Sequence, residues 1–208
     1  MIQNIESIKK QLNHSDPKII LIGCSSGGLE VLEKILFKLP KEYPLPIIIC
    51  QHIAADAGHY LRHYLAKNLN MEIFEAQTEQ LIQKNAIYFA PGGYHLLFEQ
   101  NKTFSLDVSE KVSYCRPSID VMFESAITVY NHNILAILLS GANVDGCAGA
   151  EKIFQIGGTV IAQTPQSAKY PTMPQSIIDT QHYHAALEPT EINNLLMAIT
   201  QWIKPQKS

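Results

Sequence analysis

Short apolar runs alternate with stretches of helical periodicity along most of this 208-residue chain. Residues 18–24 (KIILIGC), 45–51 (LPIIICQ) and 134–139 (ILAILL) are nearly continuous apolar runs, a pattern typical of strands that are buried on both faces of a parallel sheet. Between the first two runs, residues 29–39 place a large aliphatic side chain on every third or fourth position, as an amphipathic helix does. Strands and helices in alternation require crossover connections. The sequence therefore predicts an α/β fold, a doubly wound, mainly parallel sheet flanked by helices and Rossmann-like in architecture.

The rest of the chain is assigned by the same criteria. Residues 86–98 (AIYFAPGGYHLLF) indicate two strands about a Pro-Gly-Gly turn, so we expect an antiparallel hairpin to interrupt the parallel sheet. The other predicted strands are 71–76, 103–108 and 159–163, and the other predicted helices are 58–69, 118–130, 148–156, 174–180 and 190–203. No repeat or linker is evident, which predicts one domain over residues 18–204.

Residues 1–17 form an extension before the first strand. Ile2, Ile5, Ile8 and Leu12 have helical spacing there, so we expect a short amphipathic helix that packs on the body of the protein or on a partner. This segment has no apolar core of the kind that a signal peptide carries. No run of about 18 apolar residues occurs anywhere, so no membrane span is predicted.

Composition excludes some classes of function. The 16 Lys and Arg residues are balanced by 19 Asp and Glu residues, for a net charge of −3, which argues against a nucleic-acid groove. Four cysteines are present and none is spaced as C-x-x-C. We interpret them as reduced thiols of a cytoplasmic protein.

Three of the predicted strands end in residues that can carry chemistry. Residues 23–27 (GCSSG) form a G-x-S-x-G motif between a strand and a helix, with Ser25 at its centre. His52 follows the second strand, and Asp145 lies in the glycine-containing loop after the third. Ligands of open α/β sheets bind outside the carboxyl ends of the strands, so these side chains are expected at one rim. A serine needs an imidazole to take its proton, and the imidazole needs a carboxylate to fix its tautomer, so the three residues are a candidate triad.

Each of these residues has a simpler interpretation. His52 could be a hydrogen-bonded structural histidine, and Asp145, in an Asp-Gly pair, could be a turn residue. The glycine-rich turn could bind a phosphate, but a dinucleotide site also needs an acidic residue after the second strand, where Gln51 and His52 stand instead. A P-loop lysine is absent too, so nucleotide binding is the lesser alternative. His59 and His63 have a spacing that can bind a metal, yet no third ligand is placed near them, and a solvated helix face is favoured. No metal or organic cofactor is expected.

With these residues established, the chain resembles the chemotaxis protein-glutamate methylesterases of the CheB type, specifically their catalytic domain, over about residues 19–196. The family's opening block resembles LIGCSSGGLEVL at residues 21–32, its Gln-His pair falls on Gln51 and His52, and its late acidic residue falls on Asp145. Further matching blocks are residues 90–95 (APGGYH), 116–120 (RPSID), 162–163 (AQ) and 173–174 (MP).

The resemblance implies hydrolysis of glutamate γ-methyl esters on the cytoplasmic helices of methyl-accepting chemoreceptors, with release of methanol, and deamidation of receptor glutamines by the same acyl chemistry. Ser25 would attack, His52 would act as general base and then acid, and Asp145 would orient His52. The backbone amides of Ser26 and Ala142 are the expected oxyanion donors. The implied protein is a cytoplasmic enzyme without a cofactor, bound to no nucleic acid and not inserted in a membrane, and a monomer is favoured.

Some positions depart from the family pattern. Ala142-Asn143 stand where relatives carry Met-Gly, Cys115 stands where a histidine is usual, and Ile53-Ala54 replace Met-Pro, so substrate preference is in question more than catalysis. Arg116 could bind a receptor carboxylate or stabilise its own loop, and His95 could line the cleft.

Full-length relatives begin with a receiver domain of roughly 120 residues, a typical domain size. About 17 residues precede the first strand here, so we expect a catalytic domain without its own receiver. Two other functions stay open at this point: a non-catalytic receptor-binding scaffold, and an esterase or amidase acting on a protein outside chemotaxis.

Overall fold

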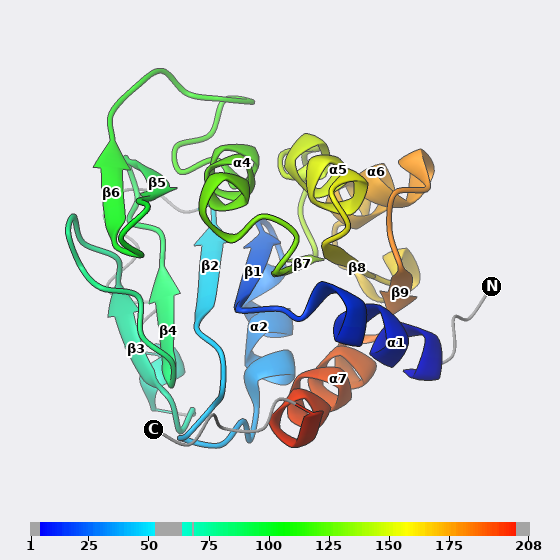
Figure 1. Cartoon of the computed structure of the whole chain (residues 1–208). Coiled ribbons are helices and arrows are strands. Elements are labelled where there is room, and N and C mark those ends of the chain that lie inside the picture. Colours follow the sequence, from blue (N-terminus) through cyan, green and yellow to red (C-terminus); the bar gives the residue numbers. More distant parts are fainter. Residues whose placement is uncertain (1–4, 53–63, 68, 203–208) are drawn as a thin grey trace.

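The computed structural model describes residues 5–52, 64–67 and 69–202, and its centre is a parallel sheet of seven strands (Figure 1). The strand order is β3-β4-β2-β1-β7-β8-β9, and every pair of neighbours is parallel. The strands are β1 (Ile19–Cys24), β2 (Ile47–Gln51), β3 (Glu72–Glu75), β4 (Ala86–Phe89), β7 (Ile134–Leu138), β8 (Thr159–Gln163) and β9 (Ala185–Leu187). The prediction of a doubly wound α/β fold is confirmed, although the short strand β9 was not anticipated.

Helices cover both faces of the sheet, as Figure 1 shows. Those on one face are α1 (Ile5–Ser15), α2 (Gly28–Leu36) and α7 (Pro189–Trp202), and those on the other are α4 (Ile119–Tyr130), α5 (Cys147–Gln155) and α6 (Thr172–Thr180). Side chains of a strand alternate between faces. In β1, Ile20 and Ile22 therefore pack toward the first set of helices, while Ile19 and Leu21 pack toward the second. This double burial explains the continuous apolar runs in the sequence.

The antiparallel hairpin is present, but the strands that form it are not the two on either side of the Pro-Gly-Gly turn. β4 joins the parallel sheet beside β2 and does not pair with β5 (His95–Phe98), the strand that follows the turn. β5 instead pairs with β6 (Phe104–Asp107) in a separate two-stranded antiparallel sheet. β4 lies between β2 and β3 and is buried throughout, so it has no free edge for β5. The turn at residues 91–93 therefore leads the chain from the large sheet to the small one.

Most other boundaries agree with the expected ones to within a few residues. A 3₁₀ turn at Pro165–Ser167 connects β8 to α6. The predicted helix over 58–69 falls largely outside the described residues, as do His59 and His63. Among the described helices, none is long and apolar enough to cross a membrane.

The N-terminal helix α1 packs on the body of this chain. Ile8 and Leu12 are buried in the core that α2 and α7 also cover. At its end the Ser15 hydroxyl lies 2.8 Å from that of Thr159 at the start of β8, and both side chains are buried. Between the two alternatives for this helix, the structure supports packing on the protein's own core.

Replacing Ile8 with alanine should therefore destabilise the whole domain. Loss of a fully buried isoleucine costs about 2–5 kcal/mol through lost burial and the cavity that remains. Urea denaturation followed by circular dichroism measures the change. Lys10→Ala, on the exposed side of the same helix, is the control and should change stability by less than about 0.5 kcal/mol. Equal stability of the Ile8 variant and wild type would contradict the packing of α1.

Candidate active site

Ser25, His52 and Asp145 follow three strands that are adjacent in the sheet, β1, β2 and β7. Cys24 and Gln51 are register partners at the ends of β1 and β2, and the His52 amide donates to the Cys24 carbonyl at 3.1 Å. The Ser25 amide donates to the carbonyl of Ser140, just after β7, at 2.9 Å. The register of the sheet thus places Ser25 between the ends of the strands that carry the other two residues.

The turn after Ser25 is stabilised from neighbouring strands. Gly27 has φ of 76°, a left-handed conformation that favours glycine, and a Cβ on it would lie 2.8 Å from the Ser140 hydroxyl. That hydroxyl donates to the Ser26 carbonyl at 2.8 Å, and the Ser140 amide donates to the side chain of Gln163 at 2.9 Å. Ser140 and Gln163 are both fully buried. Sequence reasoning did not assign this supporting role, because only the fold brings these strand ends together.

The Asp145 carboxylate is fully buried at the N-terminus of α4. It accepts hydrogen bonds from the amide of Ile119 at 2.6 Å, the hydroxyl of Ser118 at 2.8 Å and the amide of Asp120 at 3.2 Å. Burial by itself would raise the pKa of Asp145, but the hydrogen bonds from His52, Ile119 and Ser118 lower it below its usual range. Asp145 is therefore ionised in the folded protein at neutral pH.

That carboxylate fixes the orientation of His52. Nε2 of His52 lies 2.7 Å from Oδ2 of Asp145. Because the ionised carboxylate can only accept, the proton of a neutral His52 is on Nε2 and the lone pair is on Nδ1. Nδ1 in turn lies 3.5 Å from Sγ of Cys115 and 3.5 Å from Nδ2 of Asn143.

Ser25 is near this histidine, yet no hydrogen bond joins its hydroxyl to the His52 ring in the described part of the chain. Such bonds are often long without substrate and form only in the complex. The amides of Ser26 and Ala142, the expected oxyanion donors, have no hydrogen-bond partner among the described residues either. Both residues are exposed.

His95 and Arg116 hold a loop over residues 108–116 that leads into the site. The buried His95 ring accepts from the Ser118 amide at Nδ1 and donates from Nε2 to the Glu110 carbonyl at 2.9 Å. Nη1 of Arg116 donates to the carbonyls of Val108 and Ser109 at 2.6 and 2.7 Å. Of the two roles considered for Arg116, this geometry favours stabilisation of its own loop.

A parallel sheet that gathers a serine and a histidine paired with a buried aspartate at one rim fits a serine-dependent hydrolase. Comparison with known proteins gives the particular family. Residues 20–196 match the model of the CheB methylesterase family, so the chain belongs to that family.

Individual relatives agree with this membership. The chain is 39% identical to a Leptospira interrogans protein provisionally named protein-glutamate methylesterase/protein-glutamine glutaminase, over 88% of this chain and 94% of the relative. It is 33% identical to the protein-glutamate methylesterase/protein-glutamine glutaminase of Thermotoga maritima, again over 88% of this chain but only 54% of that protein. The crystal structure of the Thermotoga maritima CheB methylesterase catalytic domain superposes with a TM-score of 0.85 at 32% identity, covering 88% of this chain and 99% of that domain.

Asp120, in the first turn of α4, carries a second carboxyl group next to that of Asp145. Its Oδ1 accepts from the Gly149 amide at 2.7 Å, which joins α4 to α5. Burial and the neighbouring charge of Asp145 raise the pKa of Asp120 to about 6. In the unfolded chain an aspartate titrates near 3.9. Folding therefore favours protonated Asp120, and its ionisation lowers stability as pH rises from about 4 to above 6.

Asp120→Asn should remove this pH dependence while leaving the acceptor for Gly149 in place. The variant is expected to gain stability relative to wild type as pH rises from 4 to 8, because wild type alone must ionise a buried acid. Urea denaturation at several pH values measures the difference. Asp179→Asn, on α6, is the control and should follow wild type across the range. A difference between Asp120→Asn and wild type that does not change with pH would contradict the prediction.

Proposed function

We propose that this protein hydrolyses glutamate γ-methyl esters of chemoreceptors and deamidates receptor glutamines, with Ser25, His52 and Asp145 as its catalytic residues. Membership of the CheB methylesterase family supports the reaction class. The observation that carries the assignment of residues is the 2.7 Å contact between His52 and the buried Asp145, next to Ser25 at the end of β1. A receptor-binding scaffold without activity would not need an ionised carboxylate buried against a histidine.

The proposed reaction proceeds through an acyl-enzyme. Oγ of Ser25 attacks the ester carbonyl while Nδ1 of His52 takes the serine proton. The amides of Ser26 and Ala142 donate to the oxyanion, and Asp145 stabilises the imidazolium. His52 then gives its proton to the leaving methoxide, methanol departs, and a water activated by His52 releases the glutamate. With a glutamine side chain the leaving group is ammonia, and the steps are the same.

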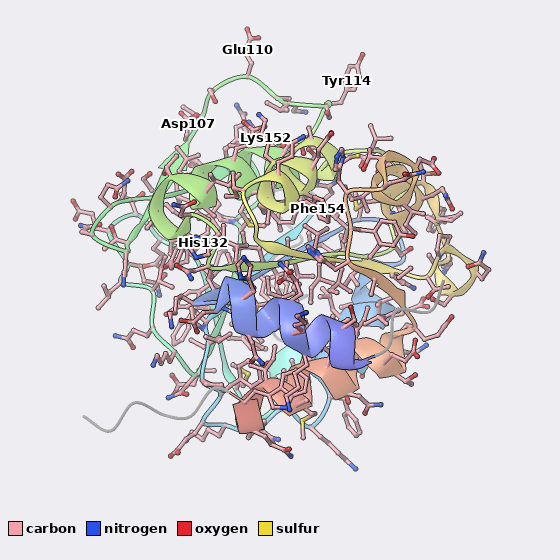
Figure 2. The ribbon with its side chains drawn as sticks, turned by 45° about the vertical axis from the view of Figure 1, so that its right-hand side comes forward. Asp107, Glu110, Tyr114, His132, Lys152 and Phe154 are labelled. Atoms are coloured by element: carbon pink, nitrogen blue, oxygen red, sulfur yellow. The ribbon has the colours of Figure 1, made fainter. Side chains whose placement is uncertain are left out.

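The loop over residues 108–116 is the proposed contact surface for the receptor helices. Val108, Val112 and Tyr114 are exposed on it, and Tyr114 is 96% exposed. In Figure 2 Tyr114 and Glu110 lie at the outer end of this loop, with Tyr114 directed away from the body. Ser113 and Tyr114 have φ of 51° and 64°, which is costly for residues other than glycine and is often found at functional sites. Cys115, the next residue, contacts His52, so the loop is continuous with the site.

Ser25→Ala should lower kcat for methanol release from methylated chemoreceptor membranes by roughly 10⁶-fold, by analogy with other serine triads. The measurement compares wild type, the variant and Ser105→Ala on strand β6, which should match wild type. Activity of Ser25→Ala within tenfold of wild type would exclude Ser25 as the nucleophile. Absence of release from wild type, together with covalent labelling of Ser25 by a sulfonyl fluoride, would favour a substrate outside chemotaxis. Absence of both would favour the scaffold.

Tyr114→Ala should weaken receptor binding without changing the chemical step. The expected result is a KM for methylated receptor raised by about 10-fold, because a large exposed aromatic side chain typically contributes above 1 kcal/mol to a protein contact, while kcat stays within about twofold. Steady-state kinetics on receptor membranes separate the two constants. Phe37→Ala, another exposed aromatic residue at the opposite end of α2 from Ser25, is the control. An unchanged KM for Tyr114→Ala would exclude the loop as a receptor contact.

A further inference from the structure

We propose that Cys115 and His52 form an inhibitory binding site for a divalent metal ion of zinc type, which switches off the hydrolase when it is occupied. The proposal rests on the function proposed above, because the metal ion would occupy Nδ1 of His52, the nitrogen that takes the serine proton in that mechanism. Three residues that can bind a metal meet here, namely Cys115, His52 and Asp145. One ligand atom from each of them lies within 4.8 Å of the other two.

The spacing of the two ligand atoms fits a tetrahedral ion. Zinc binds nitrogen at about 2.0 Å and thiolate sulfur at about 2.3 Å, so at a tetrahedral angle the two ligand atoms lie about 3.5 Å apart. Sγ of Cys115 and Nδ1 of His52 are 3.5 Å apart. An ion could therefore replace the thiol proton between these atoms with little movement of either side chain.

The orientation of the histidine fits as well. A metal-binding histidine commonly donates its other ring N–H to a carboxylate, which fixes the tautomer and makes the ligand more basic. His52 has this partner, since its Nε2 lies 2.7 Å from Oδ2 of Asp145. Asp145 itself is the outer partner and not a ligand. Its two oxygens already accept from His52, Ser118, Ile119 and Asp120.

Asn143 supplies the third group at this position. Nδ2 of Asn143 lies 3.3 Å from Sγ of Cys115 and 3.5 Å from Nδ1 of His52. Rotation of the side-chain amide by half a turn would place its oxygen at the same point, as a third ligand. This rotation would give up the 3.3 Å hydrogen bond that the oxygen accepts from the Asp145 amide, and metal ligation would replace it. The three groups form a triangle of ligand atoms, and a water molecule would supply the fourth ligand of a tetrahedral zinc site.

A nucleophilic role for Cys115 is the competing interpretation. Burial and the charge of Asp145 raise the pKa of the Cys115 thiol, so it is protonated at neutral pH and a poor nucleophile. A metal ion removes this difficulty because it binds the thiolate directly and releases the thiol proton to solvent. No oxidant or reductant is involved.

Cobalt absorption tests the site independently of enzymatic activity. Wild type titrated with Co²⁺ should develop the thiolate-to-cobalt charge-transfer band with one ion per chain. Cys115→Ser and Cys115→Ala should lose this band and bind Co²⁺ at least about 100-fold more weakly, since even outer partners of a metal site contribute 10–100-fold. Cys147→Ser, which removes the other partly exposed thiol, is the matched control and should keep the band. Retention of the band in both Cys115 variants would overturn the site.

Inhibition is tested with Zn²⁺ on the same proteins. Zn²⁺ at one equivalent should lower the rate at which a sulfonyl fluoride labels Ser25 by at least about 10-fold in wild type and in Cys147→Ser, and EDTA should restore it. Each Cys115 variant is compared with its own metal-free labelling rate. It should need at least about 100-fold more Zn²⁺ than wild type for the same fractional decrease in that rate. Zinc-loaded wild type that labels at the metal-free rate would overturn the inhibitory role. If the protein binds cobalt and its labelling is sensitive to zinc, but it releases no methanol from receptors, the metal site is supported and only the chemoreceptor function is contradicted.

Discussion

The buried carboxylate of Asp145 is the interaction on which the geometry of the site depends. An ionised group without solvent is costly to bury, and it persists only where several donors surround it. The N-terminus of α4 supplies two amides and the Ser118 hydroxyl, and His52 supplies a fourth donor. The loop after β7, the first turn of α4 and the end of β2 are consequently fixed relative to one another. A shift of any one of them would deprive the buried charge of part of its donors.

The same helix terminus also positions the exposed loop over residues 108–116. Ser118 donates through its hydroxyl to Asp145 and through its amide to Nδ1 of His95. His95 then donates to the Glu110 carbonyl, well out along the loop. A short chain of hydrogen bonds therefore connects the carboxylate to the proposed receptor surface, and Arg116 holds the carbonyls of Val108 and Ser109. The surface proposed to bind the receptor and the residues proposed to act on it would share one structural support.

Sequence alone predicted the parallel sheet and the three strand ends because both follow from local patterns. Doubly buried strands have continuous apolar runs, and carboxyl ends of neighbouring strands meet at one rim. What it could not predict depends on contacts between distant segments. The partner of β5 depends on which strand can still accept a neighbour, and the buried Ser140–Gln163 pair depends on the loop after β7 meeting β8. The side of the His52 ring that faces Asp145 is likewise a property of the fold.

Two positions at which we expect this chain to differ from its family, Cys115 and Asn143, lie next to that ring. Cys115 and Asn143 are 28 residues apart in sequence, yet they contact each other and the same nitrogen of His52. The other nitrogen faces Asp145, which the N-terminus of α4 holds. Orientation of the histidine depends on that second side, so changes on the first leave the direction of the ring unaltered. In the proposed site, the thiol next to Nδ1 adds a second ligand for a metal ion, and that ion would compete with the serine proton for this nitrogen. Changes that look scattered in sequence thus converge on the one atom through which the proposed reaction must pass.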